Sequence, residues 1–198
     1  MRKTVLVVAA HPDDEVLSCG GTIARHSDEG DDIFVCFMSN GVNSRTSHQE
    51  KERQDRSNNA DTASKILGIK KIYSFDFPDN KMDSIALLDI VQSLENVINE
   101  VKPSTIYTHH IGDLNIDHQI THKAVMTACR PQPRFCVKEI YAFEVLSSTE
   151  WQTPGLMPFI PNVFVDISEY IEIKREVLEI YSEEMREPPH SQIGRAHV

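Results

Sequence analysis

Residues 10–15 read Ala-His-Pro-Asp-Asp-Glu and directly follow the apolar run 4–9. An imidazole beside carboxylates can bind a divalent metal ion, and catalytic zinc sites use three such ligands and leave one position for water. The apolar run predicts a buried strand, so the chemistry-bearing loop stands where that strand ends. In an open α/β sheet, ligands bind outside the carboxyl ends of the strands. The sequence therefore indicates a metal site at this edge of a sheet.

A second group of candidate ligands lies in residues 107–122, which contain four histidines and two aspartates. His118 and His122 are four residues apart, so on a helix they share one face. This group begins at the end of another strand-like run, 105–109, and its side chains would converge on the same crevice as the first loop. The alternative for residues 11–14 is a simple turn with Asp14 capping a helix. Two such segments after two strands favour the metal site.

Strand-like and helix-like runs alternate along the chain. This pattern predicts a Rossmann-like, three-layer α/β sandwich with a mostly parallel sheet and an active site at the C-terminal strand ends. Strands rich in Val, Ile, Phe and Tyr are expected at 4–10, 33–39, 71–75, 105–109, 139–143 and 163–167. Helices are expected at 15–29, 48–67, 85–101, from about 117, and at 169–185. Residues 147–161 predict an irregular loop that walls the substrate pocket.

Length and composition predict one domain. The 198 residues, 40% hydrophobic, are enough for a domain that buries roughly 70% of the surface of its unfolded chain. The final hexapeptide, 193–198, resembles the translation of a common sequencing adapter. We therefore expect a single domain over residues 1–192 and a non-native tail at 193–198.

Charge and cysteine content restrict the partners. The formal net charge of -10 disfavours nucleic acid and anionic membranes as partners, because no basic excess can pair with phosphates. No stretch approaches the about 20 apolar residues of a membrane span, and the short N-terminal apolar run is read as a strand rather than a signal peptide. The four cysteines are scattered and suit a reducing compartment. We expect a cytoplasmic protein that acts on a small molecule, and assembly into a homo-oligomer is compatible with the sequence.

The first motif, together with Asp117-His118, resembles the PIG-L/LmbE-like family of zinc-dependent N-deacetylases, which remove acetyl from N-acetylglucosamine-type sugars. The resemblance covers nearly the whole chain, because three further short segments are similar to segments of the family: Leu67-Gly68, Phe77-Pro78-Asp79 and Lys102-Pro103. The resemblance implies an N-acetylated amino sugar or its conjugate as substrate. It also implies Zn²⁺ as cofactor, with Fe²⁺ as an alternative because mixed nitrogen and oxygen sites follow metal availability.

The resemblance also implies separate roles for the residues of the two motifs. His11, Asp14 and His118 would bind zinc, and Asp13 would be the general base. This division is chemically reasonable, because zinc lowers the pKa of its water while a neighbouring carboxylate accepts the proton. Asp117 is expected to orient a histidine or the loop.

The chain departs from the family pattern at Asn115. Family members often have a histidine there, three residues before the last zinc ligand, that helps to stabilise the oxyanion. An asparagine amide still donates a hydrogen bond but carries no charge. His109, His110 and His122 are alternative donors.

Three further residues are candidates for substrate binding. Arg56 matches a family position that contacts substrate, although its charged surroundings also suit a solvated helix face. Asn40 follows the run 33–39 and could lie in a rim loop. Glu144 follows the run 139–143 at the same predicted edge of the sheet.

Two other functions compete with the leading hypothesis of a zinc-dependent amidohydrolase. A nucleotide-binding Rossmann-like domain is disfavoured because acidic residues replace the Gly-x-Gly-x-x-Gly fingerprint and would repel a pyrophosphate. A metal- or sugar-binding relative that has lost catalysis is compatible with Asn115, although the retained Asp13 argues against it.

Overall fold

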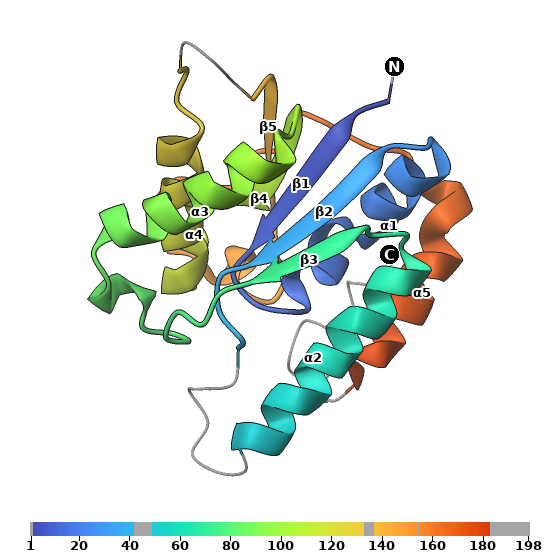
Figure 1. Cartoon of the computed structure of the whole chain (residues 1–198), viewed down its shortest axis with the longest axis horizontal. Helices are drawn as coiled ribbons and strands as arrows, with labels where there is room; N and C mark the ends of the chain where they lie inside the picture. Colours follow the sequence, from blue (N-terminus) through green and yellow to red (C-terminus); the bar gives the residue numbers. More distant parts are fainter. Residues whose placement is uncertain (1, 42–48, 133–136, 154, 183–198) are drawn as a thin grey trace.

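A computed structural model describes residues 2–41, 49–132, 137–153 and 155–182. Five strands form one sheet in the order β3-β2-β1-β4-β5, and every neighbouring pair is parallel (Figure 1). The strands are β1 (Thr4–Ala9), β2 (Asp32–Phe37), β3 (Lys71–Ser74), β4 (Thr105–His109) and β5 (Glu139–Phe143). The predicted α/β class with a parallel sheet is confirmed.

The central strand β1 explains where the site forms. Its residues from Val5 to Ala9 are fully buried, as expected of a strand covered on both faces. Val8 pairs with Cys36 of β2 on one side and with Thr108 of β4 on the other. Because β1 and β4 are parallel neighbours, the loops that follow them leave the sheet side by side.

Helices cover both faces of the sheet and form the outer layers (Figure 1). On one face α1 (Asp14–Asp28), α2 (Gln49–Ile66) and α5 (Ile171–Ile180) contribute to one apolar core cluster with the sheet. On the other face α3 (Leu87–Val101) and α4 (Ile116–Ala128) contribute to a second cluster. Helix α3 buries an apolar stripe at helical spacing, consisting of Ile90, Val91, Leu94, Val97 and Ile98.

Short 3₁₀ turns complete the described elements: η1 (Met82–Ser84), η2 (Thr149–Trp151) and η3 (Ser168–Tyr170). Helix α2 is followed by Gly68 in a left-handed conformation, with φ of 69°. This glycine lies where the sequence predicted the end of the helix, and its missing Cβ removes the steric penalty of that conformation.

The strand predicted at 163–167 is wrong. These residues form no strand, and β5 pairs only with β4 among the described residues. Val163 is 54% exposed and Phe164 is 82% exposed. A β-rich composition suggested the strand, but strand formation also requires a ladder of hydrogen bonds with a neighbour, and composition alone cannot predict that.

The last helix is shorter than predicted within the described residues. It opens with the 3₁₀ turn η3, becomes α-helical at Ile171 and ends at Ile180. The remainder of the prediction, 183–185, and the expected tail at 193–198 lie outside the described residues.

The structure bears on two expectations from the sequence, which concern the cysteines and membrane-spanning helices. Cys19, Cys36 and Cys129 are free and buried, while Cys136 lies outside the described part of the chain. Within the described residues, no helix combines the length and apolar character needed to cross a membrane.

Candidate metal centre and active site

The loop after β1 turns sharply into α1 and places three acidic side chains around the helix start. Asp14 is the first residue of α1, and its Oδ2 accepts a hydrogen bond from the His11 backbone N–H at 2.9 Å. Asp13 precedes the helix with φ of 125° and ψ of -32°. Its carbonyl oxygen accepts the first helical hydrogen bonds, from Val16 N and Leu17 N. The loop is thus held from both the backbone and the Asp14 side chain.

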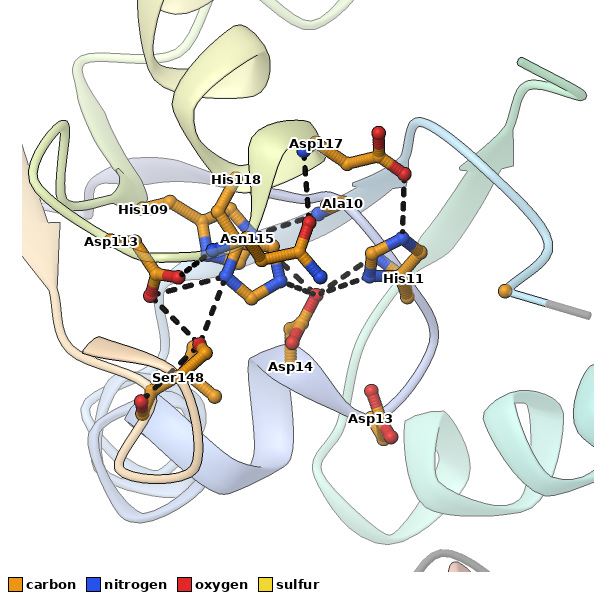
Figure 2. Close-up of polar contacts among 12 residues, drawn as sticks. Ala10, His11, Asp13, Asp14, His109, Asp113, Asn115, Asp117, His118 and Ser148 are labelled. Carbon is orange, nitrogen blue, oxygen red and sulfur yellow. Dashed lines mark hydrogen bonds and ion pairs between the residues drawn. The ribbon is translucent and has the colours of Figure 1, made fainter. Parts of the chain in front are cut away.

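Asp14 lies between two histidines, one from each predicted segment (Figure 2). Its Oδ2 is 3.3 Å from His11 Nδ1 and 3.4 Å from His118 Nε2. One ligand atom from each of these three buried residues lies within 4.8 Å of the others. Two imidazole nitrogens and a carboxylate are the donor set of a catalytic zinc site, so these residues fit a divalent metal.

Carboxylates stand behind both histidines, on the side away from Asp14. His118 Nδ1 is 3.2 Å from Asp113 Oδ2. His11 Nε2 is 3.0 Å from Asp117 Oδ2 and 3.3 Å from Asp79 Oδ1. Such partners fix the orientation and tautomer of a metal-binding histidine and leave the opposite nitrogen for the metal.

A second group that could bind a metal consists of His11, Asp79 and Asp117. Asp117 already accepts backbone hydrogen bonds on both oxygens, from Asn80 N at 2.6 Å and from Met82 N at 3.1 Å. Asp117 thus contacts His11 and also links the segment after β3 with α4. The predicted role of Asp117, which is to orient a histidine or the loop, stays a prediction.

Asp113 belongs to this buried cluster through its contact with His118, and the sequence reasoning missed it. It is fully buried, and its Oδ2 accepts hydrogen bonds from Ser148 Oγ at 2.9 Å and Thr149 Oγ1 at 2.6 Å. Its Oδ1 accepts from Asn115 N at 2.8 Å. The available signal was an aspartate five residues before a candidate metal ligand. The partners Ser148 and Thr149 come from the loop predicted at 147–161, which contains η2 and packs against this side of the site.

The charges of the cluster complement one another. Burial alone would lower the pKa of His11, but hydrogen bonds to Asp117, Asp14 and Asp79 raise it well above its ordinary value. For His118, burial also opposes the charge, and Asp14 and Asp113 raise the pKa to about 9. Burial would raise the Asp14 pKa, yet the neighbouring histidines hold it well below the usual range. The buried carboxylates therefore favour a positive charge at this position, which is also the charge that a bound cation would supply.

Asp13 lies beside this cluster rather than within it. Figure 2 shows its side chain below His11, outside the network of contacts around Asp14. The Asp13 side chain makes no capping hydrogen bond to α1, and the residue is 8% exposed. Its backbone N–H donates to Glu15 Oε2 at 2.9 Å. Burial raises the Glu15 pKa to about 8, because the carboxylate is removed from water.

Asn115 caps helix α4. Its Oδ1 accepts a hydrogen bond from Asp117 N at 2.9 Å, and its Nδ2 lies 3.5 Å from Asn80 Oδ1. Capping thus uses the oxygen of the amide, and the NH₂ group is the part that can donate to a substrate.

The three alternative histidines are held in different ways. His109 stacks on His118 with ring centroids 3.9 Å apart, and its Nε2 accepts from Ala10 N at 2.8 Å. Burial, with the charge of nearby His118, lowers the His109 pKa well below its ordinary value, so it is a neutral neighbour. His110 Nε2 donates to Met157 O and His122 Nδ1 donates to His109 O, both at 2.8 Å.

Two of the three predicted substrate-binding residues lie near the metal-site loop. Arg56, on α2, donates to the Pro12 carbonyl at 3.2 Å, and it lines a cavity of about 140 Å³ together with Asn40. The Asn40 side chain also donates to Asp76. Glu144 is exposed and lines a different cavity, of about 660 Å³, beside β5. The structure therefore groups Arg56 with Asn40 and leaves Glu144 apart from them.

The fold and the site define a class: a Rossmann-like α/β protein with a candidate metal centre at the carboxyl ends of adjacent parallel strands. Residues 6–129 match the sequence model of the PIG-L family, described as GlcNAc-PI de-N-acetylase. The chain belongs to the PIG-L family.

Relatives of the chain include proteins with different reactions. An uncharacterized deacetylase, YaiS of Escherichia coli, is 33% identical over 89% of this chain and 89% of its own length. A probable N-acetyl-alpha-D-glucosaminyl L-malate deacetylase of Bacillus cereus is 27% identical over 98% of this chain and 90% of its own. A solved structure, the 4-carboxy-2-hydroxymuconate hydratase GalB of Pseudomonas putida, is 26% identical with a TM-score of 0.76, over 92% of this chain and 80% of its own.

Proposed function

We propose that this protein is a zinc-dependent N-deacetylase that removes acetate from an N-acetylglucosamine-type sugar or its conjugate. The observation that carries the proposal is the buried group His11, Asp14 and His118, with the Asp13 carboxylate beside it. Family membership and the deacetylase relatives support the reaction class.

A zinc ion at this group would acidify a water molecule and polarise the amide carbonyl, and Fe²⁺ could supply the same chemistry. His11 and His118 would bind the metal through the ring nitrogens that face Asp14, and Asp14 would supply the third ligand. Asp113 and Asp117 hold the two rings in the required orientation. In this proposal the chain's own residues orient both histidine ligands.

In this proposal Asp13 moves the proton. Its carboxylate accepts a proton from the attacking water as the water oxygen bonds to the amide carbonyl carbon. The protonated carboxyl group then gives that proton to the sugar nitrogen as the carbon–nitrogen bond breaks. The direct products are acetic acid and the free amine, and they become acetate and the ammonium form of the sugar when the acid passes its proton to the amine. Asp13 returns to its charged state after each turnover.

The remaining polar residues position the substrate in this proposal. The Asn115 NH₂ group would donate to the developing negative charge on the carbonyl oxygen. Arg56 and Asn40 line one cavity, and a guanidinium beside an amide suits sugar hydroxyls or an attached anionic group. Glu144 would contact only a larger conjugate that extends toward β5.

A second candidate function is the addition of water to an unsaturated carboxylate. The hydratase relative favours it, because it shares the fold and 26% of the sequence. An activated water and a carboxylate base would serve either reaction, and Arg56 could pair with a substrate carboxylate.

The test incubates purified, zinc-loaded protein with a panel of N-acetylglucosaminyl compounds and measures released acetate. The same preparation is given 4-carboxy-2-hydroxymuconate, and the loss of its ultraviolet absorbance reports hydration. We expect acetate release, a decrease in kcat on the order of 10²–10⁴ for Asp13→Asn at equal zinc content, and no change for Asp28→Asn. Asp28 is a suitable control because it is exposed and bonds Tyr170 far from the site. Hydration without acetate release would favour the second candidate, and neither reaction from folded, zinc-loaded protein would reject both.

A further inference from the structure

The Asp13 backbone has a conformation that needs support from its surroundings. A non-glycine residue with φ of 125° is rare and strained, so it persists only where neighbouring contacts determine it. An aspartate before a helix ordinarily caps the helix with its own carboxylate, and Asp13 does not. Its carboxylate is therefore turned away from the helix end.

Two buried side chains supply that support. Glu15 Oε2 accepts the Asp13 N–H at 2.9 Å, and Glu15 Oε1 accepts the Tyr181 hydroxyl at 3.2 Å. Glu15 and Tyr181 are each 2% exposed, so water does not compete for these bonds. Tyr181 directly follows α5, 166 residues away from Glu15 in the chain. The two bonds connect the end of α5 to the backbone of Asp13.

The Tyr181 hydroxyl stays protonated at neutral pH and can therefore donate this hydrogen bond. Burial and the negative charges of Glu15 and Asp13 raise its pKa, so it remains a donor throughout the working pH range. These charges also show that the hydroxyl lies within electrostatic reach of the Asp13 carboxylate.

We infer that Tyr181 and Glu15 are positioning residues that hold Asp13 in its strained conformation and so aim its carboxylate at the reacting water. The inference rests on the proposed role of Asp13 as the general base. Among the described residues, neither side chain forms a hydrogen bond with the candidate ligands His11, Asp14 and His118, so their removal should alter the base while the metal remains bound.

The experiment compares Tyr181→Phe with Tyr170→Phe in the zinc-loaded protein. Both changes delete one hydroxyl near α5, but Tyr170 donates to exposed Asp28. For Tyr181→Phe we expect a three- to tenfold lower kcat, with KM and zinc content unchanged. We expect Glu15→Gln, which keeps an oxygen acceptor, to retain more activity than Glu15→Ala. The Tyr170→Phe variant should match the wild type.

A second measurement does not depend on activity. Hydrogen exchange of the Asp13 amide, followed by NMR, should be at least threefold faster in Tyr181→Phe and unchanged in Tyr170→Phe. If exchange is faster in Tyr181→Phe but the wild type releases no acetate, the contacts that support Asp13 are retained and the proposed deacetylase function is rejected. The inference would be overturned if Tyr181→Phe changed neither the exchange rate nor kcat. It would also be overturned if the zinc content fell and KM changed in proportion to kcat.

Discussion

Asp113 Oδ2 lies 3.2 Å from His118 Nδ1, while the opposite nitrogen of the same ring lies 3.4 Å from Asp14 Oδ2. Asp113 also accepts three hydrogen bonds from Ser148, Thr149 and Asn115, so its position is fixed by several segments. The ring of His118 is thus oriented by a carboxylate that itself cannot move freely. This arrangement places Asp113 behind a candidate metal ligand, where it contacts the ring nitrogen that faces away from Asp14.

We expect Asp113→Asn to weaken zinc binding by about 10- to 100-fold, because the imidazole loses its charged partner. Competition with a chromophoric chelator measures the affinity. Asp28→Asn removes a charge of the same kind at the surface and should bind zinc like the wild type. Wild-type affinity in Asp113→Asn would show that Asp113 does not orient the ligand.

The site could be predicted in part because of the parallel sheet. His11 and His118 follow β1 and β4, and parallel neighbours present their carboxyl ends at one edge. The contact of Ser148 with Asp113 could not be predicted in this way. It joins residues 35 apart in sequence through an irregular loop that has no periodicity.

The fold was predictable where a pattern determined it. The continuous apolar run of β1 indicates a strand buried on both faces, and the stripe on α3 indicates a helix. Residues 163–167 have a comparable composition but find no partner strand in the described part of the chain, so the prediction from composition was wrong there. Glu144 also follows a strand end, yet that position alone did not bring it to Arg56 and Asn40.

Metal binding should stabilise the folded chain. The three candidate ligands converge only in the folded state, and a ligand that binds only this state contributes about 2.7 kcal/mol at a free concentration of 100 times its Kd. Urea unfolding after removal of metal with a chelator, then with zinc restored, measures the difference. The His118→Ala variant should respond much less to zinc. Equal unfolding curves of the wild type with and without zinc would argue against the site.

Gly112 lies where two loops approach each other closely. A Cβ at this position would be 2.1 Å from the Met157 carbonyl oxygen and 2.7 Å from His110 Nε2. We expect Gly112→Ala to lower the free energy of unfolding by about 1–3 kcal/mol, because the backbone of one loop must shift. Gly20→Ala is the matched control, since its Cβ would be no closer than 3.4 Å to Val16. Equal stability of the two variants would contradict the close packing of the loops.

Lys174, on α5, is 9% exposed, and burial lowers its pKa because the ammonium group is removed from water. Between its lowered pKa in the folded state and its ordinary value near 10.5, the unfolded chain binds more protons than the folded one. Stability from this group therefore rises with pH through that window, and below it the charged lysine destabilises the fold.

We expect Lys174→Met to raise the free energy of unfolding at pH 7 by about 1 kcal/mol, since the apolar side chain keeps the packing without the buried charge. The advantage over the wild type should shrink as the pH approaches 10.5. Urea unfolding of both proteins from pH 7 to pH 9.5 checks this. Lys123→Met, at an exposed position of α4, should show no such trend. A destabilised Lys174→Met variant at pH 7, or an advantage that grows with pH, would reject the buried-charge explanation.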